Sequence, residues 1–305
     1  MEIDILNTLS INPEIFNRFK KQGKPVVIPG LLTGYDWDLN YLVQQLGNQE
    51  FLLRFYGKDR YQHDKRNWES IGSGVTTKLL PFNEYAELLK SHQAHEEDIY
   101  LAKCSLKHTP LGNLDYLANI GDRLSLKHPV SDFNIWIGPG GHMESLHYDT
   151  LDGTLMQLHG SKKIVLFPPN QLNNLYPFPI WRHLKNGLKT RSWFSQAYPE
   201  NPNFRDFPNF KKALNYKYEV TLNRGEILYI PAGWWHEVTA LGDEMVCSVN
   251  RFWRVYPTSR AIFSWARWRT YLGFLLAMPS ILLSLAIALF SPNRTQKIQQ
   301  IRQMF

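Results

Sequence analysis

Residues 133–167 read FNIWIGPGGHMESLHYDTLDGTLMQLHGSKKIVLF. This stretch consists of short apolar runs at 133–137, 154–158 and 163–167, separated by turn residues that include Gly138-Pro-Gly-Gly141. Short strands with glycine and proline between them are typical of a β-sandwich or a β-barrel. The stretch therefore predicts a mainly β domain.

The same pattern continues on both sides of this stretch. Further strands are predicted at 99–104, 216–222, 227–230, 236–240 and 245–252. Before them, residues 24–30 predict a strand, 38–46 and 81–89 have helical spacing, and 56–77 is polar enough to predict a loop. A segment at 170–215, rich in proline, asparagine and aromatic residues, interrupts the strands. Such long insertions are usually functional, or they bind partners.

Composition narrows the class of protein. The chain has 305 residues, of which 44% are apolar and 20% charged, so it should bury a sizeable core. Its two cysteines, Cys104 and Cys247, cannot form a disulfide framework or a four-thiolate zinc site, which fits a reduced cytosolic setting. The net charge is +7, yet residues 251–305 hold eight basic residues and no acidic ones, which leaves −1 for the rest. We therefore expect no nucleic-acid partner for the body.

The C-terminal segment has the composition of a membrane helix. Residues 272–290, LGFLLAMPSILLSLAIALF, are 19 consecutive uncharged residues with tryptophan, tyrosine and arginine just before them. The alternative is a buried helical hairpin for dimerisation, broken at Pro279-Ser280. The first residues lack the pattern of a signal peptide. We therefore expect a cytoplasmic protein, with 272–290 as a candidate anchor to the cytoplasmic face of a membrane.

Three side chains suggest a metal site. His147 and Asp149 project from the same face of a strand while Tyr148 points away, and His236 follows Trp234-Trp235 at the start of another strand. Two imidazoles and one carboxylate form a facial set that leaves three positions open, which suits Fe(II) oxygenase chemistry. A lone His-x-Asp is common by chance, and His236 alone could be a core or surface histidine. The strand ends that carry these residues favour the metal site.

These residues belong to a longer series of motifs. The series resembles the Jumonji-C, cupin-like family of Fe(II)/2-oxoglutarate dioxygenases. Within this family it most resembles the asparaginyl hydroxylase branch that acts on hypoxia-inducible factor. The resemblance covers about residues 24–256. The motifs that carry it are Pro25-Val-Val-Ile28, Trp37-Asp-Leu, Tyr41-Leu, Gly47-Asn48, Tyr100-Leu, His147-Tyr-Asp149, Lys162, Leu166-Phe-Pro-Pro169, Leu175-Tyr-Pro177, Leu228-Tyr-Ile-Pro231, Trp234-Trp-His236 and Val249-Asn250.

The resemblance implies a double-stranded β-helix over residues 98–256. Residues 1–97 would form a mixed α/β region packed on it. Residues 257–305, which the resemblance does not cover, are expected to form a basic, apolar tail that contains the candidate membrane helix 272–290. The resemblance also implies Fe(II) on His147, Asp149 and His236, and 2-oxoglutarate as co-substrate. Lys162 would bind its distal carboxylate, Tyr100 would donate a hydrogen bond to the same group, and Asn250 would lie near the metal-bound end.

The roles of Lys162 and Tyr100 have alternatives. Lys162 could be an ordinary solvated lysine and the neighbouring Lys163 the true ligand, while Tyr100 could be a core aromatic residue. The chain also departs from the family. Glu144 stands where a threonine or serine usually helps to hold the co-substrate, and Gly153 replaces a polar amide. Thr154, Gln157 or His159 could supply the missing donor, and we expect His142 to be a loop histidine rather than a fourth ligand.

The resemblance implies hydroxylation of a C–H bond on a protein or peptide side chain, with O2 and 2-oxoglutarate consumed. The substrate groove would take aromatic residues from the 170–215 insertion, which could equally form a hydrophobic satellite packed on the barrel. These aromatic residues are Tyr176, Phe178, Trp181, Trp193, Phe194 and Tyr198. Two alternatives stay open: a membrane-associated hydroxylase of a lipid or small molecule, and a non-enzymatic cupin-like binding module, which Glu144 favours. A homodimer is possible in either case.

Overall fold

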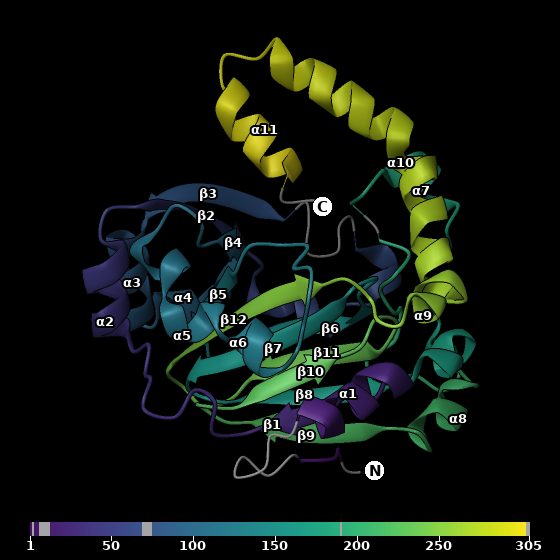
Figure 1. Ribbon diagram of the computed structural model, residues 1–305. Coiled ribbons are helices and arrows are strands. Elements are labelled where there is room, and N and C mark those ends of the chain that lie inside the picture. Colours follow the sequence, from purple (N-terminus) through teal and green to yellow (C-terminus); the bar gives the residue numbers. More distant parts are fainter. Residues whose placement is uncertain (2, 6–12, 69–74, 190, 303–305) are drawn as a thin grey trace.

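Two antiparallel sheets form the body of the molecule (Figure 1). The computed structural model describes residues 1, 3–5, 13–68, 75–189 and 191–302. Within this part of the chain, the smaller sheet has the order β6-β11-β8-β9. Its strands are β6 (Met143–Tyr148), β11 (Trp235–Ala240), β8 (Lys162–Phe167) and β9 (Tyr218–Leu222).

The larger sheet has the order β1-β10-β7-β12-β5-β4-β2-β3. Its strands are β1 (Val26–Ile28), β10 (Ile227–Ile230), β7 (Asp152–His159), β12 (Met245–Trp253), β5 (Asn134–Pro139), β4 (Ile99–Ser105), β2 (Glu50–Phe55) and β3 (Thr76–Pro81). Neighbouring strands in both sheets run antiparallel. The predicted class, a mainly β cupin-like core with flanking helices, is confirmed.

Side-chain alternation on β8 decides what fills the space between the sheets. Ile164 and Leu166 join Val27, Leu228 and Ile230 of the larger sheet in one buried apolar cluster. The intervening Val165 and Phe167 belong to a different cluster on the outer side of the smaller sheet. Because residues two apart share a face, Lys162 at the start of β8 points inward with Ile164.

Helices cover the outer face of the larger sheet. Amphipathic helices α1, α2 and α3 pack apolar side chains such as Phe16, Leu42 and Phe82 into the largest cluster of the core. The helices of this layer are α1 (Pro13–Gln22), α2 (Leu39–Leu46), α3 (Phe82–Lys90), α4 (Gln93–Glu96), α5 (Asp115–Ala118) and α6 (Ile120–Arg123). Short 3₁₀ turns at Lys58–Gln62, Lys65–Asn67 and Pro110–Asn113 connect the elements around it. The layer fixes the sheet that forms one wall of the site.

The 170–215 insertion covers the outer face of the smaller sheet. It contains η5 (Pro169–Leu175), α7 (Arg182–Asn186) and α8 (Phe210–Leu214), and its Phe178 and Phe210 are buried there. Part of it also runs beside β6, where the Tyr148 amide donates to the Trp193 carbonyl at 3.2 Å and the Ser195 amide to the Leu146 carbonyl at 2.9 Å. The insertion is therefore an integral layer that reaches the strand carrying His147.

The C-terminal segment contains the predicted apolar helix, which begins earlier than expected. After α9 (Thr258–Ile262), helix α10 runs over Trp265–Leu289, and α11 (Arg294–Arg302) turns back against it (Figure 1). Helix α10 is long and apolar enough to cross a membrane. The sequence prediction placed only 272–290 in this element, because the tryptophans and arginines of its first turns interrupt the apolar run.

Some elements were not predicted. Strand β2 was missed, and β3 begins at Thr76 inside the segment predicted as loop, of which 69–74 lie outside the described residues. Both strands hydrogen-bond into the sheet that holds β4 and β5. The division of the chain at residues 97 and 98 stays a prediction; strands from both sides of it share the larger sheet.

Candidate active site

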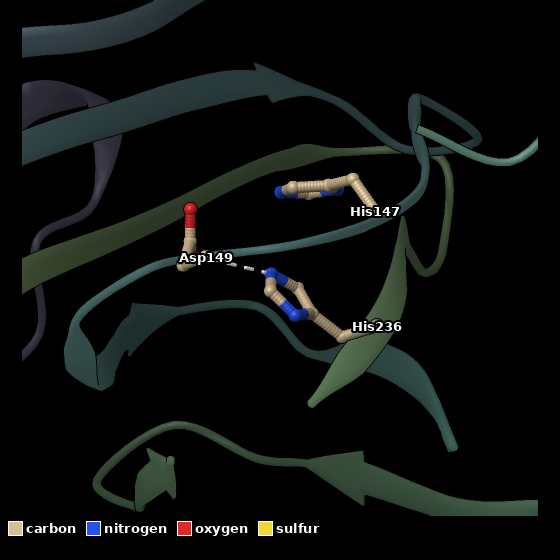
Figure 2. A group of neighbouring side chains, drawn as sticks. All are labelled: His147, Asp149 and His236. Atoms are coloured by element: carbon tan, nitrogen blue, oxygen red, sulfur yellow. Dashed lines mark ion pairs between the residues drawn. The ribbon is translucent and has the colours of Figure 1, made fainter. Parts of the chain in front are cut away.

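The strand register places the two histidine side chains next to each other, with their ring planes tilted by 56°. His236 on β11 pairs directly with His147 on β6, and their ring centroids are 4.3 Å apart (Figure 2). Asp149 follows the end of β6, and its Oδ2 lies 3.6 Å from Nε2 of His236. One ligand atom from each of the three residues lies within 4.8 Å of the others. The structure thus brings the three predicted ligands together.

Backbone carbonyls orient both imidazoles. Nδ1 of His147 lies 2.8 Å from the Ser145 carbonyl, and Nδ1 of His236 lies 3.1 Å from the Trp234 carbonyl. Because a carbonyl oxygen only accepts, each Nδ1 must carry the proton and donate it, which leaves the Nε2 lone pair free to bind a metal. Such outer hydrogen bonds fix the tautomer and orientation of metal-binding histidines. The donor set therefore fits a divalent ion such as Fe(II).

Electrostatics keep His236 in the neutral form that a metal requires. Burial, with the nearby His147 as a second cause, lowers the pKa of His236 to about 4, and the Asp149 carboxylate opposes this shift only partly. The imidazole is therefore neutral across the physiological range. Phe194 of the insertion stacks on the ring of His147, with centroids 4.8 Å apart and planes 12° apart, so the insertion holds this ligand in place.

A β-bulge places Glu144 in the same cavity. His236 pairs with His147, but Val238, two residues on, pairs with Glu144, three residues back. The extra residue on β6 reverses the alternation, so that Glu144 and His147 both line the cavity. Burial alone would raise the pKa of Glu144, but His147, His142 and Arg54 lower it overall, and the group stays anionic. Of these groups, the Arg54 guanidinium is permanently positive, and it offsets part of the Glu144 charge.

Of the adjacent lysines Lys162 and Lys163, Lys162 is the one that lines the cavity. Its Nζ donates to the Ser248 hydroxyl at 2.6 Å, its side chain is 3% exposed, and burial lowers its pKa to about 8. Lys163 instead points outward to Glu200 and Glu219, at 3.2 and 3.4 Å. A buried ammonium group bonded to a neutral hydroxyl fits an anionic ligand, because a carboxylate would offset its desolvation. Ser248 was not predicted, since one serine in a strand gives no signal.

Tyr100 and Asn250 line the same cavity as Lys162, which has a volume of about 150 Å³. Burial raises the pKa of Tyr100 well above its usual value, so its phenol stays a hydrogen-bond donor. The Oδ1 of Asn250 accepts from the Trp136 indole at 2.9 Å, which assigns its Nδ2 as the end left for other partners. The positions of both residues agree with the predicted roles, which stay predictions.

Other predicted donors divide between the cavity and its surroundings. Thr154 lines the cavity, whereas His159 pairs with Asp36 at 2.6 Å and the Gln157 amide donates to the His159 carbonyl at 2.7 Å. His142 is not in the metal-binding group; it is buried and its Nδ1 lies 2.7 Å from Asp98. The Thr154 hydroxyl, however, accepts from the Trp253 indole at 3.0 Å and donates to the Arg251 carbonyl at 3.4 Å. Each of the three proposed substitutes is therefore already engaged by other groups of the protein.

Positive charge exceeds negative charge among the cavity residues. Arg54, Lys103, Lys162 and Arg191 line it together with the carboxylates of Glu144 and Asp149. Burial, followed by repulsion from Arg191, lowers the pKa of Lys103 to about 8, and burial followed by repulsion from Arg54 lowers that of Arg191 to about 10. The cavity therefore favours anionic molecules.

Gly138 gives Tyr100 the room that it occupies. A Cβ at position 138 would lie 2.1 Å from the Tyr100 ring, whereas a Cβ at Gly153, on the same cavity, would meet nothing closer than 3.6 Å. We expect Gly138→Ala to displace the Tyr100 ring and weaken 2-oxoglutarate binding about tenfold, by the loss of one hydrogen bond. Gly153→Ala should change binding little. Calorimetric titration of both variants checks this, and equal binding by the two would show that Tyr100 takes no part.

Comparisons with known proteins agree with this geometry. The sequence profile of the cupin-like domain family matches residues 12–259. Over 259 residues the chain is 37% identical to tRNA wybutosine-synthesizing protein 5 of Homo sapiens, covering 78% of this chain and 73% of the relative. It is 34% identical over 258 residues to JmjC domain-containing protein D of Dictyostelium discoideum, covering 76% and 53%.

A third relative is named as a lysine-specific demethylase. The chain is 36% identical over 190 residues to lysine-specific demethylase JMJ31 of Arabidopsis thaliana, covering 60% of this chain and 32% of the relative. It thus spans about half of the Dictyostelium protein and a third of the Arabidopsis protein. Members of this family are typically iron- and 2-oxoglutarate-dependent oxygenases. From the matched profile, the two sheets and the His-Asp-His group between them, the chain belongs to the cupin-like JmjC domain family.

Proposed function

We propose that this protein is an Fe(II)/2-oxoglutarate-dependent dioxygenase that hydroxylates a C–H bond of a protein or peptide side chain. One observation carries the proposal. Two imidazoles with their Nδ1 protons turned away and one carboxylate converge within 4.8 Å, in a cavity that also holds a buried lysine. A structural role needs neither the free Nε2 lone pairs nor the buried ammonium group.

Each residue has a defined part in this proposal. His147, Asp149 and His236 hold the iron, while Lys162 and Tyr100 bind the distal carboxylate of 2-oxoglutarate and Asn250 supports its other end. Bound iron with these co-substrates supplies the oxidation in which O2 and 2-oxoglutarate convert C–H into C–OH, with succinate and CO2 as the other products. The protein orients the reactants and excludes water from the cavity.

The substrate class rests on resemblance and on the walls of the cavity. The curated relatives bear names for lysine demethylation and for tRNA wybutosine synthesis, so the family name alone does not decide it. The resemblance of the sequence motifs to the asparaginyl hydroxylases is what favours a protein side chain. Trp193 and Phe194 of the insertion line the cavity, where an extended peptide could pack on them, whereas Trp181 is 63% exposed outside it.

Succinate formation tests the proposal. The purified full chain is supplied with Fe(II), 2-oxoglutarate and O2, with and without a peptide library, and succinate is measured. We expect turnover above background that the peptide substrate stimulates, and none in His147→Ala, which loses a metal ligand. If the wild-type protein neither consumes nor binds 2-oxoglutarate while it binds Fe(II), the enzyme proposal fails, and a non-enzymatic binding module is favoured.

A second candidate is an amphiphilic substrate such as a lipid. Trp193, which lines the cavity, packs against Phe274 of α10 with ring centroids 5.1 Å apart. The cavity wall and the apolar helix are therefore in direct contact. Lipid extracts assayed in parallel with the peptide library separate the two candidates, because only the true substrate class raises succinate above the uncoupled rate.

A further inference from the structure

Helix α10 has two distinct faces. From Ala266 to Ile281 its buried residues recur at spacings of one to four residues on one side of the helix, and Ala288 follows two turns later; most of them are small: Ala266, Arg269, Thr270, Gly273, Ala277, Ile281 and Ala288. The opposite side consists of exposed large apolar side chains: Trp265, Trp268, Leu272, Leu275, Met278, Leu282, Leu283 and Phe290. We call this exposed side the outer face.

The buried face is built into the body of the protein. The Arg269 guanidinium donates to the carbonyls of Ser192 and Phe178, and the Thr270 hydroxyl donates to Tyr148, which precedes the metal ligand Asp149. A Cβ at Gly273 would lie 2.8 Å from the His183 ring, so the helix approaches α7 closely there. These contacts run along the helix as far as Ser280, whose hydroxyl lies against Gly187.

The outer face has no charged side chain between Trp268 and Phe290. Leu275 is 65% exposed, Leu283 63% and Phe290 91%, which makes a continuous apolar strip several turns long. Soluble proteins rarely expose such a strip without a partner. At its beginning stand Trp268 and Tyr271, and Arg267 donates to the Tyr271 hydroxyl at 2.7 Å. This mixture of aromatic rings and a cation is typical of a membrane–water interface.

We propose that α10 docks the protein on an anionic lipid bilayer, lying in the plane of the surface with its outer face among the acyl chains. A helix that spanned the bilayer at 272–290 would have to withdraw Gly273, Ala277 and Ile281 from the body. In-plane docking keeps those contacts and buries only the face that water now touches. The proposal is independent of the oxygenase activity.

Charge favours a lipid surface over a second copy of the chain. Residues 251–305 carry eight basic and no acidic side chains. In a two-fold dimer through α10, this positive segment would face itself, which is unfavourable. Anionic headgroups would instead neutralise cations at the two ends of the helix, such as Arg267 in its first turn and the exposed Arg294 just after it.

Flotation with vesicles tests the docking. We expect the full chain to float with vesicles of phosphatidylcholine and phosphatidylglycerol and to bind pure phosphatidylcholine more weakly. The double variant Leu275→Glu and Leu282→Glu should lose at least about tenfold in binding, because both carboxylates would enter the acyl region. Val130→Glu with Tyr216→Glu, two exposed apolar positions away from α10, is the matched control and should float normally. Circular dichroism and thermal unfolding of all three proteins report on folding without any need for turnover.

Probe depth distinguishes an in-plane helix from a spanning one. The native cysteines are buried, so the single variants Leu275→Cys, Leu282→Cys and Leu289→Cys can be labelled selectively with a fluorophore. In-plane docking predicts equal quenching at all three sites by lipids that carry a shallow quencher. Depth that increases from 275 to 282 would overturn the proposal in favour of a span. A dimer that dissociates in the double variant, with no flotation of either protein, would overturn it in favour of self-association.

Discussion

Replacing Lys162 with methionine is expected to abolish useful 2-oxoglutarate binding while making the protein without co-substrate more stable. The Nζ of Lys162 is buried beside Ser248, and its loss removes the cation that would face the distal carboxylate. Losing one partner of a buried charge pair costs about 3–5 kcal/mol, so the Kd should rise by about two to four orders of magnitude.

Stability should move in the opposite direction. Burial lowers the pKa of Lys162 from 10.5 to about 8, so keeping it charged costs the folded protein about 3 kcal/mol below pH 8. Between about pH 8 and 10.5 the unfolded chain binds more protons than the folded one, so the stability of the wild-type protein should rise with pH in this window. Methionine removes the cost at every pH, less about 1 kcal/mol for the orphaned Ser248 hydroxyl.

Calorimetric titration with 2-oxoglutarate and thermal unfolding at pH 7 and 9 measure both effects. Lys163→Met is the matched control, because its side chain pairs with Glu200 and Glu219 at the surface. It should bind 2-oxoglutarate normally. A Lys162→Met protein that binds normally, or a Lys163→Met protein that does not, would show that the wrong lysine has been assigned.

His236→Ala should lower the affinity for Fe(II) by at least about a hundredfold, since removal of even an outer-sphere partner of a metal ligand costs ten- to a hundredfold. His236 supplies a neutral Nε2 that its Trp234 hydrogen bond holds toward His147 and Asp149. Competition with a chromophoric chelator measures the affinity without any need for turnover.

His159→Ala provides the comparison. It removes another imidazole that lies near a carboxylate, that of Asp36, outside the metal-binding group. Its Fe(II) affinity should equal that of the wild-type protein. If His236→Ala also binds Fe(II) as tightly as the wild-type protein does, the three side chains do not form the metal site. That result would contradict both the proposed activity and the proposed role of iron.

Much of the fold followed from the order of strand and turn residues. The glycine- and proline-rich breaks between apolar runs predicted the antiparallel β core, and the uncharged run after Leu272 predicted the C-terminal helix. Strand β2 was missed because Glu50 and Arg54 interrupt its apolar residues. Its assignment depends on pairing with β3 and β4, which local sequence does not encode.

The candidate site shows the limit of alternation arguments. Side chains alternate along a strand, so His147 and Asp149, two residues apart, were correctly placed on one side. The same rule places Glu144, three residues before His147, on the opposite side. The bulge opposite His236 and Val238 is what turns Glu144 toward the cavity. Likewise, only the packing of Ile164 and Leu166 between the sheets distinguishes Lys162 from Lys163. Register and bulges are properties of paired strands, so a single strand does not reveal them.

The two sheets divide the chemistry between them. The proposed metal ligands come from β6, its end and β11, whereas Tyr100, Thr154 and Asn250 line the cavity from strands β4, β7 and β12 of the facing sheet, and Ser248 on β12 accepts from Lys162. Glu144 and Lys162 also line the cavity, and they belong to the smaller sheet with the proposed metal ligands. A directed-evolution library confined to those three strands would therefore explore new 2-oxo acids as co-substrates, while every variant inherits the proposed metal ligands unchanged.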